Sequence, residues 1–172
     1  MVFIILVGIP LRVNAVEIGS PNIGIYDTDG YAVRDVVSGS EYVYAAQTGN
    51  ERPLHVINIT DPINPSLLGR GYTSKRYEVH CLDVNDAETI LIIGASSYVC
   101  VYNITNKTNP IRTAEIDVGS TVYDLEIWGN YVYCAANSAG MPIVNITDVN
   151  NPSVIYNGIM MAIAMITCMV YI

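Results

Sequence analysis

The side chains in this sequence with the clearest chemical potential are asparagines in Asn-X-Thr acceptor sequences. These sequons begin at Asn58, Asn103, Asn106 and Asn145. In an exported chain each of these asparagines is a candidate glycosylation site. Three of them recur at a regular spacing, which favours a structural role, because Asn and Thr side-chain oxygens accept backbone N–H groups at chain corners. The sequence alone leaves both interpretations open.

One short segment has the residue types of a metal site. Asp27-Thr28-Asp29-Gly30 resembles the start of a calcium loop, with carboxylates at alternate positions and a glycine for the turn. It lacks the later acidic ligands that such a loop needs, and Asp-Gly is also an ordinary turn signal. We therefore predict no metal site and no cofactor.

The two histidines are the remaining candidates for catalysis. His55 and His80 lie in predicted strands far apart in the chain, and neither has a neighbouring Ser, Cys or carboxylate in a recognisable motif. The sequence also contains no Gly-rich phosphate loop and no paired-carboxylate motif. We therefore predict structural histidines, no catalytic residue and no enzymatic activity.

The net charge of the chain excludes one class of partner. The chain has 8 Lys and Arg against 16 Asp and Glu, a formal net charge of −8, which argues against nucleic acid as a partner.

The four cysteines are Cys81, Cys100, Cys134 and Cys168. No pair has metal-like spacing, and each lies in or beside an apolar strand pattern, so we expect buried thiols. One disulfide remains open, since the expected compartment is oxidising.

The N-terminus has the pattern of a signal peptide. Residues 2–11 are apolar apart from Gly8 and Pro10, and Val13-Asn14-Ala15 places small residues for cleavage after Ala15. The apolar run is shorter than the roughly 20 residues of a membrane span. We predict a signal peptide over residues 1–15 and a secreted or cell-surface protein, although no basic residue precedes the run.

An internal repeat indicates the fold. The tripeptide Asn-Ile-Thr occurs at Asn58, Asn103 and Asn145, with spacings of 45 and 42 residues. An Asn-Pro pair follows each copy six residues later, at Asn64-Pro65, Asn109-Pro110 and Asn151-Pro152. Two landmarks with one period predict tandem structural units. We place the repeats at approximately 31–76, 77–121 and 122–158, with a truncated repeat at 159–172.

The elements that hold these residues are predicted to be short strands. In the first unit the pattern predicts strands at residues 31–37, 41–47, 54–59 and 66–72, separated by turn formers and by a proline-rich corner. Four strands in about 44 residues, repeated in tandem, are typical of a β-propeller blade. We predict an all-β, incomplete propeller of four-stranded antiparallel blades over residues 16–172, with about three to four blades.

The ends of the chain carry a further expectation. Closed propellers typically have 4–8 blades, so we expect the missing blades to come from a full-length chain or from an oligomer. Residues 158–165 fit the first strand of another blade, and residues 169–172 fit its second. The alternative for this apolar end is a truncated membrane anchor.

At this point the residues resemble a known family. The segment from Leu54 to Gly69 is similar to the LVIVD repeat, and the similarity recurs at Val101–Arg112 and Ile143–Val154. The usual Asp of that motif is Asn in all three copies, and the second copy has Asn106-Lys107 where the first has Asp61-Pro62. The resemblance implies an exported propeller of bacteria or archaea with no settled biochemical role, and it brings no catalytic residue.

The loops that differ between repeats are the candidate binding surface. They are Thr48–Arg52, Ser74–Arg76 and Asn137–Met141. Ligands of repeat proteins often meet such unrepeated loops. We therefore predict a binding, adhesion or scaffold module for an unknown protein or carbohydrate at the cell surface. The alternative is a fragment of a hydrolase-like propeller enzyme with its site at the central axis.

Overall fold

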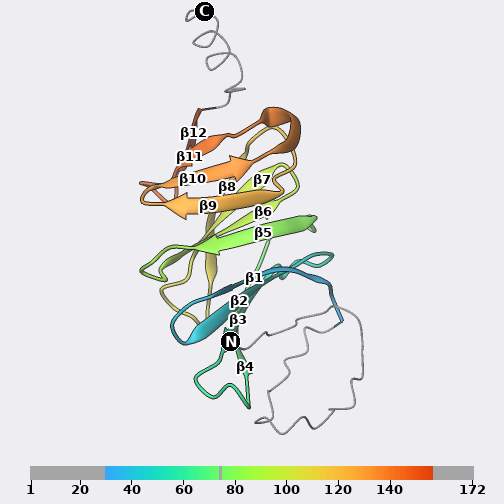
Figure 1. The fold of residues 1–172 in the computed structure, drawn as a ribbon, viewed down its shortest axis with the longest axis vertical. Coiled ribbons are helices and arrows are strands. Elements are labelled where there is room, and N and C mark those ends of the chain that lie inside the picture. The colour runs from blue at the N-terminus through green and yellow to red at the C-terminus, as the bar shows by residue number, and fades with distance from the viewer. Residues whose placement is uncertain (1–29, 74, 157–172) are drawn as a thin grey trace, which may run out of the picture.

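A computed structural model describes residues 30–73 and 75–156 of the chain. The predicted signal peptide, Asp27–Asp29, Cys168 and the predicted truncated repeat lie outside the described residues. Within them the chain forms three four-stranded antiparallel sheets and one short 3-10 helix, η1 (Asn137–Ala139), which is the predicted all-β architecture (Figure 1). No helix in the described part of the chain is long and apolar enough to span a membrane.

Each sheet is built from four strands that are consecutive in the chain. The first sheet contains β1 (Val33–Ser38), β2 (Tyr42–Gln47), β3 (Leu54–Asn58) and β4 (Ser66–Gly71). The second contains β5 (Val79–Val84), β6 (Ile90–Ala95), β7 (Tyr98–Asn103) and β8 (Ile111–Asp117). The third contains β9 (Asp124–Trp128), β10 (Tyr131–Ala135), β11 (Ile143–Asn145) and β12 (Ser153–Tyr156). Such meanders need only short turns, which the Gly, Asn and Pro residues between the strands supply.

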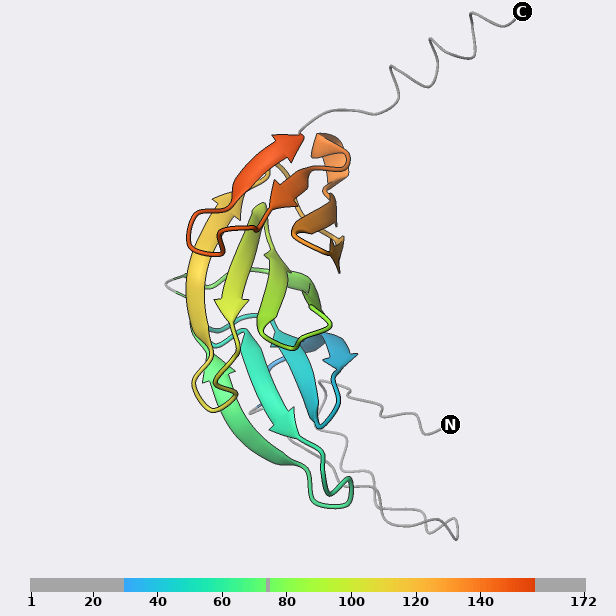
Figure 2. The same ribbon diagram turned by 90° about the vertical axis from the view of Figure 1, so that its left-hand side faces the viewer.

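The three sheets stack face to face in an arc (Figure 2). The first strands of the sheets, β1, β5 and β9, lie on the concave side, and the last strands, β4, β8 and β12, lie on the convex side. Strand order within a sheet therefore runs from the inside of the arc to the outside, as in a propeller blade.

Two apolar cores fill the spaces between neighbouring sheets. Between the first and second sheets, the buried side chains include Tyr44, Leu54, Val56, Leu91 and Ile93. Between the second and third, they include Ile92, Val101, Val132 and Val144. The second sheet is thus buried on both faces, which explains its nearly continuous apolar strand sequences.

Aspartates on the inner strands connect neighbouring sheets. The backbone N–H of Leu82 in β5 donates to Oδ2 of Asp35 in β1, at 2.9 Å. The N–H of Ile127 in β9 donates to Oδ2 of Asp83 in β5, at 2.7 Å. In both cases the other carboxylate oxygen accepts the N–H of the next residue in its own strand, at 2.8 Å. One carboxylate therefore ties two inner strands together.

A glutamate in the β5–β6 turn makes a second link between the first two sheets. Oε1 of Glu88 accepts the backbone N–H of Ser40 at 2.6 Å, and Oε2 accepts the Tyr44 hydroxyl at 2.9 Å. Nζ of Lys107 donates to the Glu88 carbonyl oxygen. The β5–β6 turn is longer than its counterparts in the other two sheets. The extra residues bring the Glu88 carboxylate within hydrogen-bond distance of Ser40 and Tyr44 in the first sheet.

Candidate binding site between two rim loops

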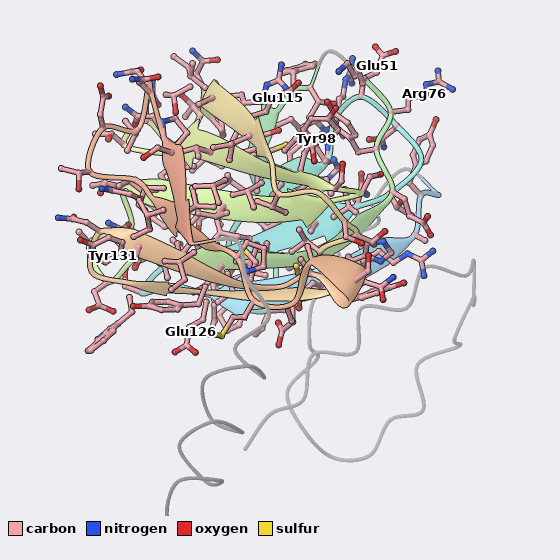
Figure 3. All side chains as sticks on the ribbon, turned by 90° about the horizontal axis from the view of Figure 1, so that it is seen from above. Glu51, Arg76, Tyr98, Glu115, Glu126 and Tyr131 are labelled. Atoms are coloured by element: carbon pink, nitrogen blue, oxygen red, sulfur yellow. The ribbon has the colours of Figure 1, made fainter. Side chains whose placement is uncertain are left out.

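A cleft of about 200 Å³ opens between two loops on one rim of the arc. One loop joins β2 to β3, and the other joins β4 to β5. The cleft is lined by Tyr31, Asn50, Glu51, Arg52, His55 and Arg76. Two of the three loops that differ most between repeats thus meet here. Figure 3 shows Glu51 and Arg76 close together and well separated from Glu126 and Tyr131 of the third sheet.

Backbone bonds fix the two loops against each other. Within the β2–β3 loop, the N–H of Arg52 donates to Oδ1 of Asn50 at 2.8 Å, an Asx turn that sets the loop's shape. The N–H of Thr73 donates to the carbonyl oxygen of Glu51 at 3.0 Å. The N–H of Val79 donates to Oγ1 of Thr48 at 3.2 Å. The two loops are therefore shaped and held against each other by hydrogen bonds from backbone N–H groups, two of which end on the side-chain oxygens of Asn50 and Thr48.

Charged side chains line the opening, and an exposed aromatic ring lies beside one of them. Nε of Arg76 lies 3.7 Å from Oε1 of Glu51, and both side chains are largely exposed, at 70% and 61%. Such a surface pair contributes little to stability, so either side chain can give up its partner and bind a polar ligand at little cost. The guanidinium of Arg52 lies 5.3 Å from the ring centre of Tyr72, which is itself exposed.

The floor of the cleft is a buried histidine. His55 lies in β3, opposite Ala45 of β2 and Arg70 of β4, and its residue is 1% exposed. A central strand of a sheet holds this side chain between two neighbours, so its position does not depend on the loops. His55 therefore contributes to the floor of the cleft while it is held by its own sheet, and its structural role stays a prediction.

A polar cluster adjoins the second loop. Lys75 lies 3.6 Å from Oε1 of Glu115 and 5.2 Å from the ring centre of Tyr98. The Tyr77 hydroxyl donates to Oε2 of Glu115 at 2.9 Å. Arg112 pairs with the same carboxylate. This cluster anchors the β4–β5 loop to β8 of the second sheet.

The third variable loop lies apart from the cleft. Residues 137–139 form η1, and Oγ of Ser138 lies 3.0 Å from Oγ of Ser120 in the loop before β9. Both loops belong to the third sheet's end of the arc (Figure 1). Of the three variable loops named as the candidate binding surface, the first two therefore line this cleft and the third does not.

The sequon asparagines have structural partners. Oδ1 of Asn58 accepts the backbone N–H of Thr60 at 2.8 Å, and Asn103 and Asn145 make the same bond to Thr105 and Thr147 at 2.9 and 2.8 Å. Asn106 accepts the N–H of Thr108 at 3.1 Å. Each sequon is thus an Asx turn. Glycosylation at these four residues stays a prediction.

His80 occupies a different place from His55. It lies in β5 on the concave side, and its ring centre is 5.1 Å from that of Tyr123. Its Nε2 is buried and has no hydrogen-bond partner among the described residues. The two histidines are therefore not brought together.

The other predicted groups are placed as follows. Gly30 of the calcium-like segment has φ +77° at the start of the described chain. Within the described residues, no group of three acidic, His or Cys residues is arranged to hold a metal. Cys81, Cys100 and Cys134 are buried free thiols. Burial raises the pKa of each thiol to about 12, so all three are protonated at neutral pH.

Solved structures share this architecture, and 167 chains match it. One is the periplasmic gluconolactonase of Pseudomonas aeruginosa, with a TM-score of 0.66 and 9% sequence identity. The similarity covers 77% of this chain and 41% of the enzyme. This likeness shows the fold, an incomplete β-propeller, and confirms the predicted fold class. A search of the curated proteins gave no match.

The same comparison corrects the prediction that the chain is not an enzyme. That prediction depended on the absence of a catalytic motif, yet a gluconolactonase is built on this fold. A propeller assembles residues from several blades, so a site need not appear as a local motif in one segment of sequence. At 9% identity the likeness extends to the fold alone, so no enzymatic activity is assigned to the chain.

The family comparison agrees with the motif found in the sequence. The LVIVD repeat matches residues 29–73 and 119–157, which contain the first and third sheets. The second sheet has the same strand order and the same Asx turn at Asn103. The predicted resemblance is confirmed: this chain contains LVIVD repeats at two segments and has the fold of an incomplete β-propeller.

Proposed function

We propose that this chain is part of an exported β-propeller that binds a carbohydrate through the cleft between the β2–β3 and β4–β5 loops. The observation that carries the proposal is the lining of that cleft, in which Asn50, Glu51 and Arg52 bring amide, carboxylate and guanidinium groups to one opening. Hydroxyl groups both donate and accept hydrogen bonds, so a mixed set of donors and acceptors suits a sugar.

The size and the aromatic groups of the cleft support a small polar ligand. Its volume of about 200 Å³ is below the roughly 300–1,000 Å³ of sites for drug-sized molecules. Tyr31 in the lining is 41% exposed, and an exposed ring packs against the apolar face of a sugar while its hydroxyl bonds to a neighbour. A large protein epitope would need a broader contact area.

Three observations support an exported location. The sequence predicts a signal peptide, the LVIVD resemblance implies exported proteins, and the gluconolactonase that shares the fold is described as periplasmic. The expectation that the ligand lies at the cell surface follows from this location.

Binding to a panel of immobilised neutral and acidic oligosaccharides tests the proposal. We expect wild-type protein to be retained by at least one of them, and we expect the double variant Glu51→Ala, Arg76→Ala to bind at least tenfold more weakly. Asp86→Ala is the matched control, because Asp86 is an exposed acidic residue in the β5–β6 turn, outside the cleft. Retention by no oligosaccharide, or equal retention of the wild type and the double variant, contradicts the proposal.

A second candidate function is hydrolysis at the concave side of the arc. It is favoured by the unpartnered Nε2 of His80, since a buried polar atom without a partner requires an explanation. The shared fold suggests glucono-δ-lactone as the first substrate to test. This candidate predicts lactone opening above the uncatalysed rate, and loss of that activity in His80→Asn. A wild-type rate equal to the blank rejects this candidate.

A further inference from the structure

The outer face of the third sheet repeats the packing surface of the first two sheets. In β10 and β11, Tyr133 lies opposite Ile143. The corresponding cross-strand pairs are Tyr44 with Val56 in the first sheet and Ile92 with Val101 in the second. All four of those residues are 0% exposed, because the following sheet covers them. Tyr133 and Ile143 are only half-buried.

Large apolar side chains surround this uncovered pair. Trp128, beside Tyr131 at the end of the β9–β10 hairpin, is 74% exposed, and Ile155 in β12 is 54% exposed. The neighbours of Trp128 and Ile155 in their strands, Ile127 and Val154, pack inward against the second sheet. Side chains alternate along β9, so Trp128 lies on the outward face.

Ile155 is the extra residue of a bulge in β12. Its counterpart in β8 is Thr113, whose hydroxyl donates to the carbonyl oxygen of Val149 in the β11–β12 turn of the third sheet, so Ile155 also faces outward. A contiguous apolar face of this kind marks an interaction surface.

Asp124, on the same face, makes one of the two hydrogen bonds that Asp35 makes in the first sheet. Asp124 in β9 lies opposite Ala135, as Asp35 in β1 lies opposite Ala46. Oδ1 of Asp124 accepts the N–H of Leu125 at 3.0 Å, which matches the bond from Val36 to Asp35. Oδ2 of Asp124 has no hydrogen-bond partner among the described residues, whereas Oδ2 of Asp35 accepts an N–H from the next sheet.

We propose that this face is the docking surface for residues 158–172 of the same chain, which add the inner strand of a fourth sheet, and that Oδ2 of Asp124 accepts a backbone N–H of that strand. The two existing interfaces use the same face of the preceding sheet, so a further strand here continues an established pattern. It extends the arc in the direction in which the chain already runs.

Chain length agrees with this occupant. Residues 72–78 connect β4 to β5, and residues 118–123 connect β8 to β9. After β12 ends at Tyr156, a connection of similar length leaves enough residues before Ile172 for one strand of the length of β9. The proposed strand thus begins later than the 158–165 expected from the sequence pattern, and it replaces the two short strands expected there. Residues 159–172 contain Thr167 as their only clearly polar side chain, which suits a strand packed on an apolar face.

Hydrogen–deuterium exchange of the 172-residue chain tests the docking. We expect backbone amides within residues 158–172 to be protected in the wild type, and Asp124→Asn to lower that protection by about tenfold, because one bond to a charged acceptor is lost. Asn keeps one oxygen for the Leu125 N–H. Asp86→Asn is the matched control, since Asp86 is an exposed carboxylate in the β5–β6 turn of the second sheet, outside this face, and we expect wild-type protection.

A second variant keeps the test independent of the folding of Asp124→Asn. Tyr133→Arg places a charge at the centre of the proposed interface, and we expect it to abolish protection in residues 158–172 while β5–β8 stay protected. Unprotected amides in wild-type residues 158–172 overturn the proposal, as does equal loss in Asp124→Asn and Asp86→Asn. Protection that depends on protein concentration and accompanies a dimer in sedimentation also overturns it, by assigning the face to a second copy.

Discussion

The Asp83 carboxylate accepts the backbone N–H of Ile127 at 2.7 Å and so links β5 of the second sheet to β9 of the third. Asp35 makes the corresponding link from β1 to β5. Both acceptors are partly buried, where a charge-assisted bond is stronger than at the surface. The stack is therefore stabilised by specific polar bonds on its concave side as well as by its apolar cores.

Removing the Asp83 carboxylate is expected to weaken the contact between the second and third sheets. Asp83→Ala leaves the N–H groups of Ile127 and Val84 without their acceptor, so we expect the free energy of unfolding to fall by about 2–3 kcal/mol. Urea denaturation followed by circular dichroism measures this change. Asp86→Ala, at an exposed position, is expected to stay within about 0.5 kcal/mol of the wild type. Equal stability of both variants contradicts the role of Asp83.

The Glu88 link is expected to make stability depend on pH in the acid range. Burial alone raises the pKa of the Glu88 carboxyl, but the bonds from Ser40 and Tyr44 outweigh it and leave the pKa below its usual value. A carboxyl with a lowered native pKa stabilises the fold above its unfolded pKa of about 4.3, and that contribution disappears as the pH falls through the native pKa.

Glu88→Gln isolates this contribution. We expect the variant to be less stable than the wild type at pH 7, and the difference to narrow as the pH is lowered below about 4. Urea unfolding at a series of pH values measures the difference directly. A gap between the two proteins that stays constant from neutral to acid pH is the opposite result and rules out this titration.

Gly69 is expected to resist substitution because two backbones approach closely there. A Cβ built on Gly69 of β4 overlaps the carbonyl oxygen of Lys107 and lies 2.9 Å from the carbonyl carbon of Thr108. A backbone neighbour cannot rotate away, so Gly69→Ala is expected to destabilise the protein by about 1–3 kcal/mol. Thermal unfolding measures the loss. An unchanged melting temperature is incompatible with this packing of the first sheet on the second.

The buried thiols are expected to be unreactive in the native protein. Because burial raises the pKa of Cys81, Cys100 and Cys134 to about 12, almost no thiolate forms at pH 8. We expect these three thiols to react with a disulfide reagent such as DTNB only after denaturation, when all of them become accessible. Rapid native labelling, mapped to any of the three by peptide mass spectrometry, contradicts their burial.

The repeated parts of the fold were predictable from the sequence. The Asn-Ile-Thr and Asn-Pro landmarks fix the corner between the third and fourth strands of each unit, and the observed strands of the first sheet differ from the predicted ones by at most two residues at each end. Period-two patterns identified the buried faces, because a one-residue shift exposes the opposite side of a strand.

The links between sheets were not predictable in the same way. Asp35 and Asp83 each link two inner strands, yet they occupy different positions in their own strands. When β1 and β5 are aligned by their pairing registers, Asp35 corresponds to Cys81, which is two residues before Asp83. Alignment of the repeats therefore hides their common role. Glu88 lies in a turn that the sequence showed to be longer, but its partners Ser40 and Tyr44 are more than 40 residues away.

The candidate site was predictable only as a set of loops. Sequence variation pointed to Thr48–Arg52 and Ser74–Arg76, and the structure joins them across one cleft. The sequence did not indicate that Asn137–Met141 lies apart, nor that His55 forms the floor, because both facts depend on how the sheets stack.

The most direct test of the central claim is amide chemical-shift mapping of ¹⁵N-labelled protein titrated with the oligosaccharide that it retains most strongly from the panel. The proposed function predicts that the largest shifts cluster in residues 48–53 and 72–78, with His55 among them, and that they vanish in the Glu51→Ala, Arg76→Ala variant. Shifts confined to the concave strands β1, β5 and β9 would contradict the cleft as the binding site and favour a site at the axis.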